Sequence, residues 1–585
     1  MASLIVHLLL VGTCVLVVAG TNLLGNGDFE SATLGTYWSK SGCSWAISTT
    51  EKRGGAQSVL ITSRSNNWAG LGYFIQTPDV TSGKLYAFVG YIKLENLAAG
   101  FLYHDVFVKL RVETLDGSKS YSNLSIHPRL RPGSWHEVGG DFKLPENVKE
   151  IKIYIQIEEK DVNYFFDDAS LLELVPDPNW KSNAESDIDL NRMVTLNIIV
   201  RKVKGIKLKQ FTIEVITFCF TVEQKRSEFG HGTALQAKLW TNSSYSVFKD
   251  FVHNTLRPEW GVLINALKWR GMRWTEDNLR FDDANATLND LLDHGMSIRG
   301  HNVFWSVEQW VPDWVQSITD PAEMLSKING RISEAVTLTK GRLAHWDVNN
   351  ENLHDDFYER TTGNINITMD MFRDMNAAEP NTELFLNDFG VVNQGRYTTA
   401  LKDQARSFID NQVPIHGIGV QSHFGSTDID MTQLKYRLDK VAEAGLPIWV
   451  TEMSIQGSNF TAKAEALEDV LTMYFSHRSV AGVILWGFWG ASLKWPTNGG
   501  TEPTVAVNKA GQKYMDLVNT AWRTNWSAKL KTYKNRRYFK GKYTIQVKKN
   551  DEVLKTIDFD LLKQRKLKLK VKGTDDSPKV TAKLT

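Results

Sequence analysis

The chain has 585 residues, of which 42% are hydrophobic and 23% are charged. This length excludes a small single domain, since domains average roughly 150 residues, and the hydrophobic share excludes a disordered chain. The formal net charge of +2 conceals an asymmetry: residues 526–585 hold 18 Lys and Arg against 6 Asp and Glu, whereas the preceding residues hold 50 against 60.

The N-terminus is apolar. Residues 4–19 are almost wholly hydrophobic and end in the small residues Ala19 and Gly20. This pattern is typical of a secretory signal peptide, so we expect residues 1–20 to be removed and the protein to be secreted and extracellular. A single-pass anchor is the alternative, because no Lys or Arg precedes the apolar run. No later segment holds 18 uncharged apolar residues, so we expect no membrane association of the mature chain.

Cysteines and glycosylation sequences agree with this location. Cys14 lies in the leader, and Cys43 and Cys219 fall in segments that we expect to be different domains, so no intradomain disulfide is predicted. Asn-x-Ser/Thr sequences, which mark a glycoprotein but also occur by chance, stand at Asn123, Asn242, Asn285, Asn366, Asn459 and Asn525.

Residues 21–176 have an all-β pattern. Short β-branched or alternating runs at 58–61, 85–89, 106–110 and 151–155 are separated by turn sequences. This spacing predicts a β-sandwich of the jelly-roll type. The Pro-containing and polar residues that follow predict a linker and a lead-in strand over 177–211.

Residues 212–525 alternate between apolar strand-like runs and amphipathic helical stretches. The predicted strands are 229–235, 260–264, 297–301, 343–348, 384–387, 417–421, 448–452 and 482–486. Helical stretches such as 282–294, 432–444 and 462–477 lie between them. Eight such units over about 300 residues predict a (β/α)8 TIM barrel. An open doubly wound sheet would need a Gly-rich phosphate turn after an early strand, and the sequence has none.

Residues 526–585 predict a small basic β-module with strands at 542–547, 553–559, 567–571 and 580–584. A basic surface of this kind could bind nucleic acid or an anionic surface. Because the charges are interleaved with strand-like apolar residues, we favour a solvated face on the module and expect no nucleic-acid partner.

Polar residues at strand ends carry the chemistry, because catalytic groups of a TIM barrel lie at the carboxyl ends of its strands. Two of them, Glu351 and Glu452, are carboxylates on apolar strands. Burying a carboxylate is costly unless it is paired or functional. Two carboxylates at one barrel mouth fit glycoside cleavage, in which one protonates the leaving oxygen and the other attacks the anomeric carbon. The alternative is that each Glu is a buried partner of Lys or Arg.

The barrel sequence resembles glycoside hydrolase family 10, the endo-β-1,4-xylanases. The matching motifs, in order, are FGHGTA (229–234), NALKW (265–269), IRGH (298–301), WDVNNE (346–351), LFLNDF (384–389), GIGVQSH (417–423), VTE (450–452) and LWG (485–487). The resemblance covers roughly residues 212–525, and eight motifs in one order are specific.

The resemblance implies a retaining enzyme with Glu351 as acid/base and Glu452 as nucleophile. It implies that Asn350 bonds the 2-hydroxyl of the cleaved sugar, and that Gln421 and His423 contact that hydroxyl and the nucleophile. The full predicted substrate-binding set is Asn265, Lys268, His301, Trp305, Asn350, Asn387, Gln421, His423, Trp486 and Trp495. We expect a monomer that needs no cofactor for catalysis and acts on plant cell-wall polysaccharide.

Three positions depart from the family pattern. Ile264 stands where the family usually has Glu, Ser306 where it often has His, and Ser454 where it often has the Asp that orients the histidine. We expect Ile264 and Ser306 to lie at the glycone sites and to affect the choice between xylan and glucan. The missing Asp at 454 concerns the tuning of Glu452 and not its identity.

The N-terminal region resembles the jelly-roll carbohydrate-binding modules joined to such enzymes, through residues 22–30, 165–170 and 64–68. The resemblance implies sugar contacts from Arg64, Trp68 and Tyr103, with core packing as the alternative for the two aromatic residues. It also implies a structural calcium held by Glu30 and Asp168. Residues 539–543 resemble a β-appendage found behind some eukaryotic members.

Two other functions stay open. Within the same class, the chain could be an endo-β-1,4-glucanase or a dual xylanase and cellulase. From a different class, it could be a non-catalytic carbohydrate-binding protein, although a barrel without activity would be free to lose both glutamates.

Overall fold

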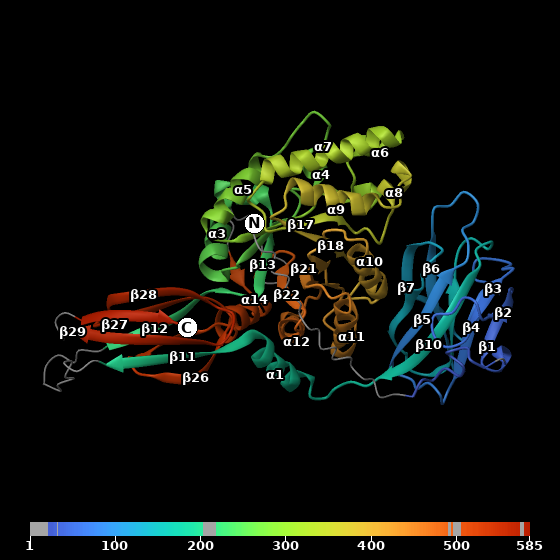
Figure 1. Cartoon of the computed structure of the whole chain (residues 1–585), viewed down its shortest axis with the longest axis horizontal. Helices are drawn as coiled ribbons and strands as arrows, with labels where there is room; N and C mark the ends of the chain where they lie inside the picture. Colours follow the sequence, from blue (N-terminus) through green and yellow to red (C-terminus); the bar gives the residue numbers. More distant parts are fainter. Residues whose placement is uncertain (1–20, 32, 203–217, 489–492, 495–504, 574–577) are drawn as a thin grey trace. The chain divides into compact units, whose positions relative to one another are not determined.

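The computed structural model describes residues 21–31, 33–202, 218–488, 493–494, 505–573 and 578–585 (Figure 1). The expected signal peptide therefore lies outside the described residues. The chain divides into two compact units, Met1–Pro176 and Asp177–Thr585. Among the described residues, no helix has the length and hydropathy needed to cross a bilayer.

The N-terminal unit is a β-sandwich of two five-stranded antiparallel sheets, as predicted. One sheet has the order β1 (Trp38–Ser41), β4 (Gly70–Gln76), β9 (Val148–Gln156), β6 (His104–Thr114) and β7 (Lys119–Leu130). The other has the order β2 (Ser44–Ser48), β3 (Ser58–Thr62), β10 (Tyr164–Leu174), β5 (Leu85–Leu94) and β8 (His136–Lys143). Alternate residues of the strands face inward and bury aromatic side chains such as Trp38, Tyr73 and Phe166 between the sheets.

The second unit contains the predicted parallel barrel. Its strands are β13 (Gly230–Leu235), β14 (Trp260–Leu263), β15 (Ser297–Gly300), β17 (His345–Asn350), β18 (Glu383–Asp388), β19 (Gly417–Val420), β21 (Ile448–Ile455) and β22 (Val480–Leu485). Each pairs in parallel with the next, β13 pairs with β22, and β15 pairs with β17. The short strands β16 (Phe304–Trp305) and β20 (His423–Phe424) pair in parallel with β17 and β21 at the barrel mouth.

Helices surround the barrel (Figure 1). The longer ones are α5 (Asp282–Asp293), α7 (Pro321–Thr339), α9 (Ile367–Ala378), α10 (Thr398–Asp410), α11 (Met431–Ala442), α12 (Phe460–Ser476) and α14 (Lys509–Met515); the shorter ones are α2 (Ala237–Trp240), α3 (Ser246–Asp250), α4 (Trp269–Met272), α6 (Asp313–Gln316) and α8 (Phe357–Thr362). Four begin at side-chain caps, since Asp320, Asp430, Asn459 and Asn508 accept hydrogen bonds from the first amides of α7, α11, α12 and α14. Pro321 at the first position of α7 adds to that start signal.

The predicted linker is a helix, which corrects the sequence interpretation. Residues Trp180–Arg192 form α1, which packs on α12 of the barrel. Ala184 and Ile188 lie one turn apart and are buried, and Arg192 donates to the carbonyl oxygens of Phe475, His477 and Val480. The buried stripe is only one residue wide, so the polar majority of the segment hides its helical period.

The C-terminal β-module is a two-sheet sandwich whose strands come from segments before and after the barrel in the sequence. One sheet has the order β26 (Tyr533–Phe539), β11 (Met193–Lys202), β29 (Arg565–Gly573) and β30 (Pro578–Leu584); the other has the order β25 (Asn525–Lys529), β12 (Phe218–Ser227), β27 (Gly541–Lys549) and β28 (Glu552–Leu561). Figure 1 shows the green strands β11 and β12 beside the red ones.

The four strands predicted near the C-terminus are thus confirmed, but they do not make the module alone. The residues assigned to a lead-in strand supply β11 and β12, whose Leu196, Ile198 and Phe220 are fully buried in the core of the sandwich. Four strands could not cover one another's apolar faces, so the module requires the segment that precedes the barrel.

Candidate active site

Glu351 and Glu452 both lie at the carboxyl end of the barrel. Glu351 directly follows β17, and Glu452 lies in β21. Both are buried, with exposed fractions of 9% and 4%. The backbone of Glu351 has a φ of 55°, in the left-handed region, and its amide donates to the carbonyl oxygen of Asn387 at 2.9 Å. A non-glycine residue in this region is strained, and such strain is typical of functional positions.

The surroundings of Glu351 favour its protonated form. Gln421 Nε2 donates to one carboxyl oxygen at 2.9 Å, and Trp305 Nε1 donates to the other at 2.7 Å. Burial raises the pKa of Glu351, and the negative charges of Asp388 and Glu452 raise it further against the effect of those two hydrogen bonds. A carboxyl group that keeps its proton near neutral pH can act as a general acid.

The surroundings of Glu452 favour the carboxylate. His423 Nε2 lies 3.4 Å from one oxygen, and His301 Nε2 lies 3.9 Å from the other, which also accepts from Asn387 Nδ2 at 3.0 Å. Burial pushes the pKa of Glu452 upward, but the electrostatic attraction of His301, the hydrogen bond from His423 and the charge of Lys268 outweigh burial, and the net pKa is below its ordinary value. Glu452 is therefore the group available for nucleophilic attack.

His301 is held by a buried charge pair that the sequence analysis did not single out. Asp347 Oδ2 lies 2.9 Å from His301 Nδ1, and the carboxylate also pairs with Arg299, which is 1% exposed. Because Asp347 fixes Nδ1, the Nε2 of His301 is directed to Glu452. The one sequence signal was an Asp inside an otherwise buried strand, four residues before Glu351.

Asn350 has an unused donor in the site. It is 1% exposed, and its Oδ1 accepts from Asn387 Nδ2 at 2.9 Å. Its Nδ2 is buried with no hydrogen-bond partner among the described residues. Buried donors are almost always satisfied, so this amide is suited to a ligand hydroxyl.

Gln421 and His423 contact different carboxyl groups of the site. The sequence analysis expected Gln421 and His423 to serve the sugar 2-hydroxyl and the nucleophile. His423 does approach Glu452, but the Gln421 amide donates to Glu351. Asn387 is the amide that bonds Glu452, and Thr451 Oγ1 fixes the orientation of Asn387 by donating to its Oδ1 at 2.6 Å.

Lys268 and two indoles line the same end of the barrel. Lys268 Nζ lies 4.3 Å from the ring centroid of Trp305 and 5.8 Å from that of Trp486. Trp486 meets His301 edge to face, with centroids 5.3 Å apart. Burial lowers the pKa of Lys268, and the nearby acids oppose that effect. The predicted sugar-contact residue Asn265 is exposed just after β14, whereas Trp495 lies outside the described residues.

Ser306 does not line a sugar site, which corrects the expectation for that position. Its side chain is completely buried, and its hydroxyl accepts from Asn352 Nδ2 at 3.0 Å. Ile264 is half-buried and packs against an apolar cluster inside the barrel. Of these two departures, Ile264 is thus the one with exposed side-chain surface after β14.

The predicted sugar contacts of the N-terminal module separate into two groups. Arg64 is 4% exposed, and its guanidinium donates to main-chain carbonyl oxygens, including Ala69 at 2.8 Å and Ile157 at 2.6 Å. This corrects its assignment, because Arg64 braces the loop and offers no free donor to a ligand. Trp68 on that loop is 51% exposed and presents its indole to solvent, and Tyr103 is half-buried.

The residues predicted to hold calcium are occupied by protein donors. Glu30 Oε1 accepts from the amides of Ala56 and Gln57 at 2.7 and 3.2 Å, and Asp168 Oδ2 pairs with Arg53 at 2.7 Å. As arranged, both carboxylates are engaged by protein donors that order one loop. The calcium site gains no support and stays a prediction.

Comparison with known proteins places these features in a family. Residues 222–513 match the family described as Glycosyl hydrolase family 10, and residues 21–163 match the family described as Carbohydrate binding domain. The chain is 24% identical to endo-1,4-beta-xylanase 1 of Arabidopsis thaliana over 574 residues, which are 92% of this chain and 57% of that protein.

Two further similarities have different extents. The anti-sigma-I factor RsgI6 of Acetivibrio thermocellus is 33% identical over 303 residues, covering 51% of this chain and 38% of that protein. A solved structure of the endo-1,4-beta-D-xylanase 10B of Clostridium thermocellum with xylohexaose is 14% identical and covers 86% of this chain and 97% of that one, with a TM-score of 0.42.

The chain spans less than two thirds of the length of the Arabidopsis xylanase and of RsgI6. The family match covers all eight barrel strands and both glutamates, and the second match covers most of the N-terminal sandwich. The chain therefore belongs to glycosyl hydrolase family 10, with a carbohydrate binding domain that precedes the barrel in the sequence.

Proposed function

We propose that this chain is a secreted, retaining endo-β-1,4-xylanase. The observation that carries the proposal is the opposite tuning of two carboxyl groups at one barrel mouth. The pKa of Glu351 is raised and that of Glu452 is lowered, by different neighbours. Two acids whose environments separate their pKa values in this way have the properties of a general acid and a nucleophile.

The reaction follows from these properties. The Glu452 carboxylate attacks the anomeric carbon while Glu351 gives its proton to the departing glycosidic oxygen, which forms a glycosyl-enzyme ester and releases the aglycone chain. The ester removes the negative charge of Glu452, so the pKa of Glu351 falls and its carboxylate can accept a proton from water. That water attacks the anomeric carbon and restores Glu452, with net retention of configuration.

Other groups would position the sugar. The unpaired Nδ2 of Asn350 would donate to the 2-hydroxyl, where a hydrogen bond that strengthens in the transition state contributes to catalysis. Trp305 and Trp486 would provide apolar ring faces for the pyranose rings, and Lys268 lies over both indoles as a donor to hydroxyls. The names of the Arabidopsis relatives support xylan as the substrate.

Secretion is proposed from the N-terminal sequence and agrees with the glycosylation sequences. Asn242, Asn285, Asn366, Asn459 and Asn525 are exposed, and Asn123 is half-buried. Cys43 and Cys219 lie in different units and are unpaired in the structure, so the described residues place no disulfide requirement on the secreted protein.

The product profile from purified enzyme tests this function. We expect early release of mixed xylo-oligosaccharides from xylan, and slower or no cleavage of β-glucan and carboxymethyl-cellulose. Release from glucan that exceeds release from xylan would favour the glucanase alternative, which Ile264 at the family's usual Glu position supports. A single short product from chain ends would contradict the endo mode, and no cleavage of any of the three would favour a non-catalytic binding protein.

A further inference from the structure

The C-terminal sandwich has one outer sheet face that carries only positive charge. Along β29, Leu567, Leu569 and Val571 face the core and are buried. The alternating residues on the other side are exposed lysines, at 566, 568, 570 and 572. Because successive side chains of a strand point to opposite faces, these four lysines stand in one row about 7 Å apart on the outer face.

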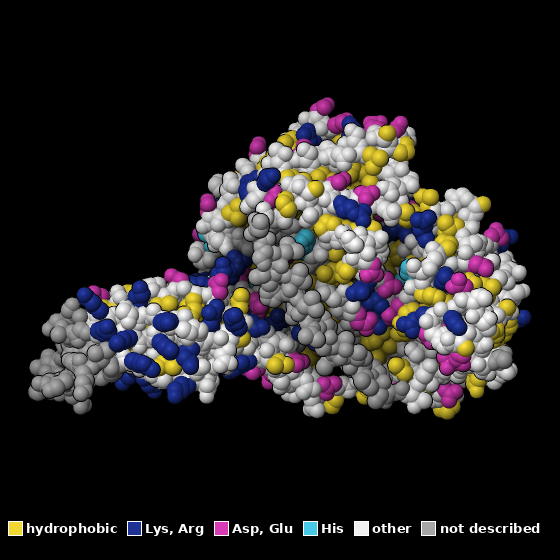
Figure 2. Space-filling view, in the orientation of Figure 1, with side chains coloured by type: hydrophobic (Ala, Val, Ile, Leu, Met, Phe, Trp, Pro, Cys, Tyr) yellow, Lys and Arg dark blue, Asp and Glu magenta, His cyan; other side chains and the backbone are white. Residues whose placement is uncertain are grey.

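Neighbouring strands add further basic side chains to the same outer face. The register of β29 and β30 places Lys568 opposite Lys583 and Lys572 opposite Lys579, and the register of β11 and β29 places Arg201 beside Lys570. We call this set the basic face: Arg201, Lys566, Lys568, Lys570, Lys572, Lys579 and Lys583. On the side in view in Figure 2, Lys and Arg crowd the sandwich with few acidic side chains among them.

Among the residues that the structure describes, no acidic side chain balances the basic face. None of the strands β11, β29 and β30 contains Asp or Glu. Within the described parts of the chain, no side chain of the basic face has an ion-pair partner. The next acidic residues in the sequence, Asp575 and Asp576, lie outside the described residues. Like charges directly opposite one another in a sheet destabilise it, so the fold itself gains nothing from this arrangement.

The other outer face of the sandwich provides an internal comparison. There Lys542 lies opposite Asp560, and Lys225 pairs with Glu223 at 2.6 Å. Asp558 on the same face accepts from Thr544 Oγ1 at 2.5 Å. Solubility alone would not require one face with mixed charge and another with a single sign, because mixed charges serve it equally well.

We propose that the basic face binds an acidic polysaccharide whose ring carboxylates repeat along an extended chain. Exposed ammonium groups in parallel rows suit a flexible polyanion, and each is a compact charge with donors for a carboxylate. Apart from Met193, which packs against the core of the barrel, the remaining outward positions of the three strands are Thr195, Asn197, Ile199 and Thr581. They offer no aromatic ring on which a nucleic-acid base could stack, and no apolar ridge to enter a membrane.

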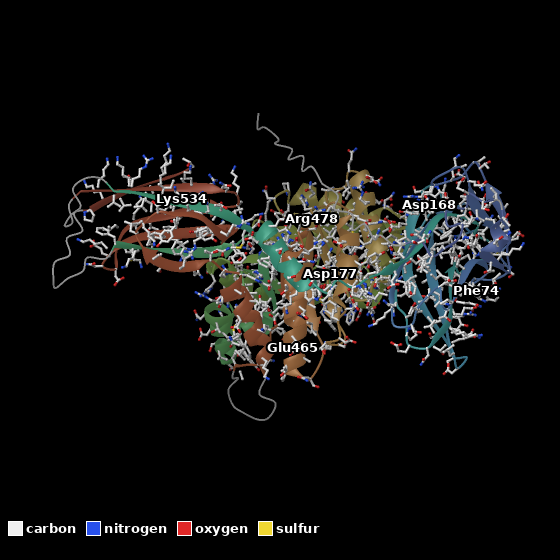
Figure 3. All side chains as sticks on the ribbon, turned by 90° about the horizontal axis from the view of Figure 1, so that it is seen from below. Phe74, Asp168, Asp177, Glu465, Arg478 and Lys534 are labelled. Atoms are coloured by element: carbon white, nitrogen blue, oxygen red, sulfur yellow. The ribbon has the colours of Figure 1, made fainter. Side chains whose placement is uncertain are left out.

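The choice of a carbohydrate partner rests on the proposed function, since the same chain carries a glycosidase-family barrel and a carbohydrate binding domain. Contact with an acidic component of the wall would hold the enzyme near its neutral substrate and raise the effective substrate concentration. Figure 3, which labels Lys534 on the edge strand β26, shows long nitrogen-tipped side chains standing out from the sandwich. Such exposed charges act through a field that salt screens, so binding should weaken as ionic strength rises.

The test compares three forms of the full chain. The first is wild type, and the second is the triple variant K568Q/K570Q/K572Q on the basic face. The third is the matched control K225Q/K529Q/K542Q, which removes the same charge from exposed positions of the other sheet. Binding to polygalacturonate, duplex DNA and anionic phospholipid vesicles is measured at low salt and at about 0.15 M salt. Hydrolysis of a neutral xylo-oligosaccharide is measured in parallel.

We expect the basic-face variant to lose about tenfold or more of its affinity for polygalacturonate, with a weaker salt dependence, while the control loses less than about twofold. The Tm of the basic-face variant should not fall, because the substitutions relieve repulsion among the lysines. Equal losses in both variants, no binding of polygalacturonate by wild type, or tighter binding of DNA or vesicles than of polygalacturonate would each overturn the proposal. Oligosaccharide hydrolysis tests the proposed function separately. If the chain does not cleave the oligosaccharide, the binding comparison among the three forms can still be interpreted.

Discussion

The imidazole Nδ1 of His423 lies 2.8 Å from the hydroxyl oxygen of Ser454. The other ring nitrogen, Nε2, lies 3.4 Å from the carboxylate of Glu452. Ser454 thus occupies the position beside the histidine where related sequences often have Asp. Asp388 does not take the place of that Asp, because its carboxylate accepts from the Leu353 amide at 2.9 Å and lies 2.8 Å from His354 Nδ1. His423 therefore lies between the carboxylate of Glu452 and a neutral partner, the hydroxyl group of Ser454.

Replacing Ser454 with Asp should strengthen the ionisation of Glu452. A carboxylate at this position would favour the charged imidazolium of His423, and that charge would lower the pKa of Glu452 further. Activity requires Glu452 to be ionised, so the acidic limb of the profile of kcat/KM against pH should move to lower pH. The shift should be under about one pH unit, because one partly screened charge contributes roughly 1 kcal/mol.

The alkaline limb should stay in place in this variant, because it reports the proton on Glu351. Ser454→Asn is the matched control, since it offers a hydrogen-bonding side chain of similar size without charge. An acidic limb that is the same in Ser454→Asp and wild type would show that His423 does not transmit the charge.

Replacing Glu351 with Gln should separate substrates by their leaving groups. The variant keeps the shape of the side chain but has no proton to give, so cleavage of xylan should fall by roughly 10²–10⁴-fold, the usual contribution of a general acid. Aryl glycosides with acidic phenol leaving groups need no protonation, so their glycosylation step should fall much less. Equal losses on both substrates, measured in the pre-steady state, would contradict the acid role.

Replacing Asp347 with Asn should destabilise the barrel. The variant leaves Arg299 buried without a charged partner, and breaking a buried pair in this way costs about 3–5 kcal/mol. Burial pushes the pKa of Asp347 up, but Arg299 and His301 outweigh it and hold the net pKa low. The folded pKa is then below the unfolded one, so this stabilisation is present above about pH 4 and is lost as pH falls.

Thermal unfolding as a function of pH measures this effect. We expect the Tm of wild type to decline below about pH 4 and the variant to show a lower Tm with a weaker decline. The double variant Arg299→Met with Asp347→Leu removes both charges and should recover part of the loss. A single variant as stable as wild type would show that the pair contributes nothing.

Removing residues 21–176 should affect attachment and not turnover. The cut follows the boundary between the two units, and it keeps α1, which packs on the barrel. Turnover of short soluble oligomers should stay within about twofold, while binding to insoluble xylan should weaken because the module acts through proximity. The point variant Trp68→Ala, which removes the exposed indole, is the milder test. Unchanged binding to insoluble xylan after truncation would show that the module is a scaffold.

The sequence was most informative where one local pattern determined the result. The eight parallel strands and both glutamates were predictable, because each lies in an apolar run with a polar end. Asp347 was not singled out, since its role depends on Arg299 and His301, which only the barrel brings to it. The burial of Ser306 was not predictable, because it depends on contacts with Asn350 and Asn352 that only the folded barrel provides.

The split C-terminal sandwich shows a different limit. The strand character of residues 193–202 was visible, but its partners β26 and β29 lie more than 300 residues further along the chain. Each segment shows a strand pattern of its own, but neither pattern identifies a pairing partner at such a distance. The helix α1 was missed because only one side chain per turn is buried against α12, and so narrow a stripe gives little helical periodicity in the sequence.

The most direct test of the central claim is the anomeric configuration of the first product. Proton NMR during the first minutes of xylan hydrolysis, before mutarotation, distinguishes the two anomers at the new reducing end. A retaining enzyme with Glu452 as nucleophile and carboxyl groups roughly 5–5.5 Å apart releases the β-anomer first. Initial release of the α-anomer would contradict the double displacement, with Glu351 as acid/base and Glu452 as nucleophile.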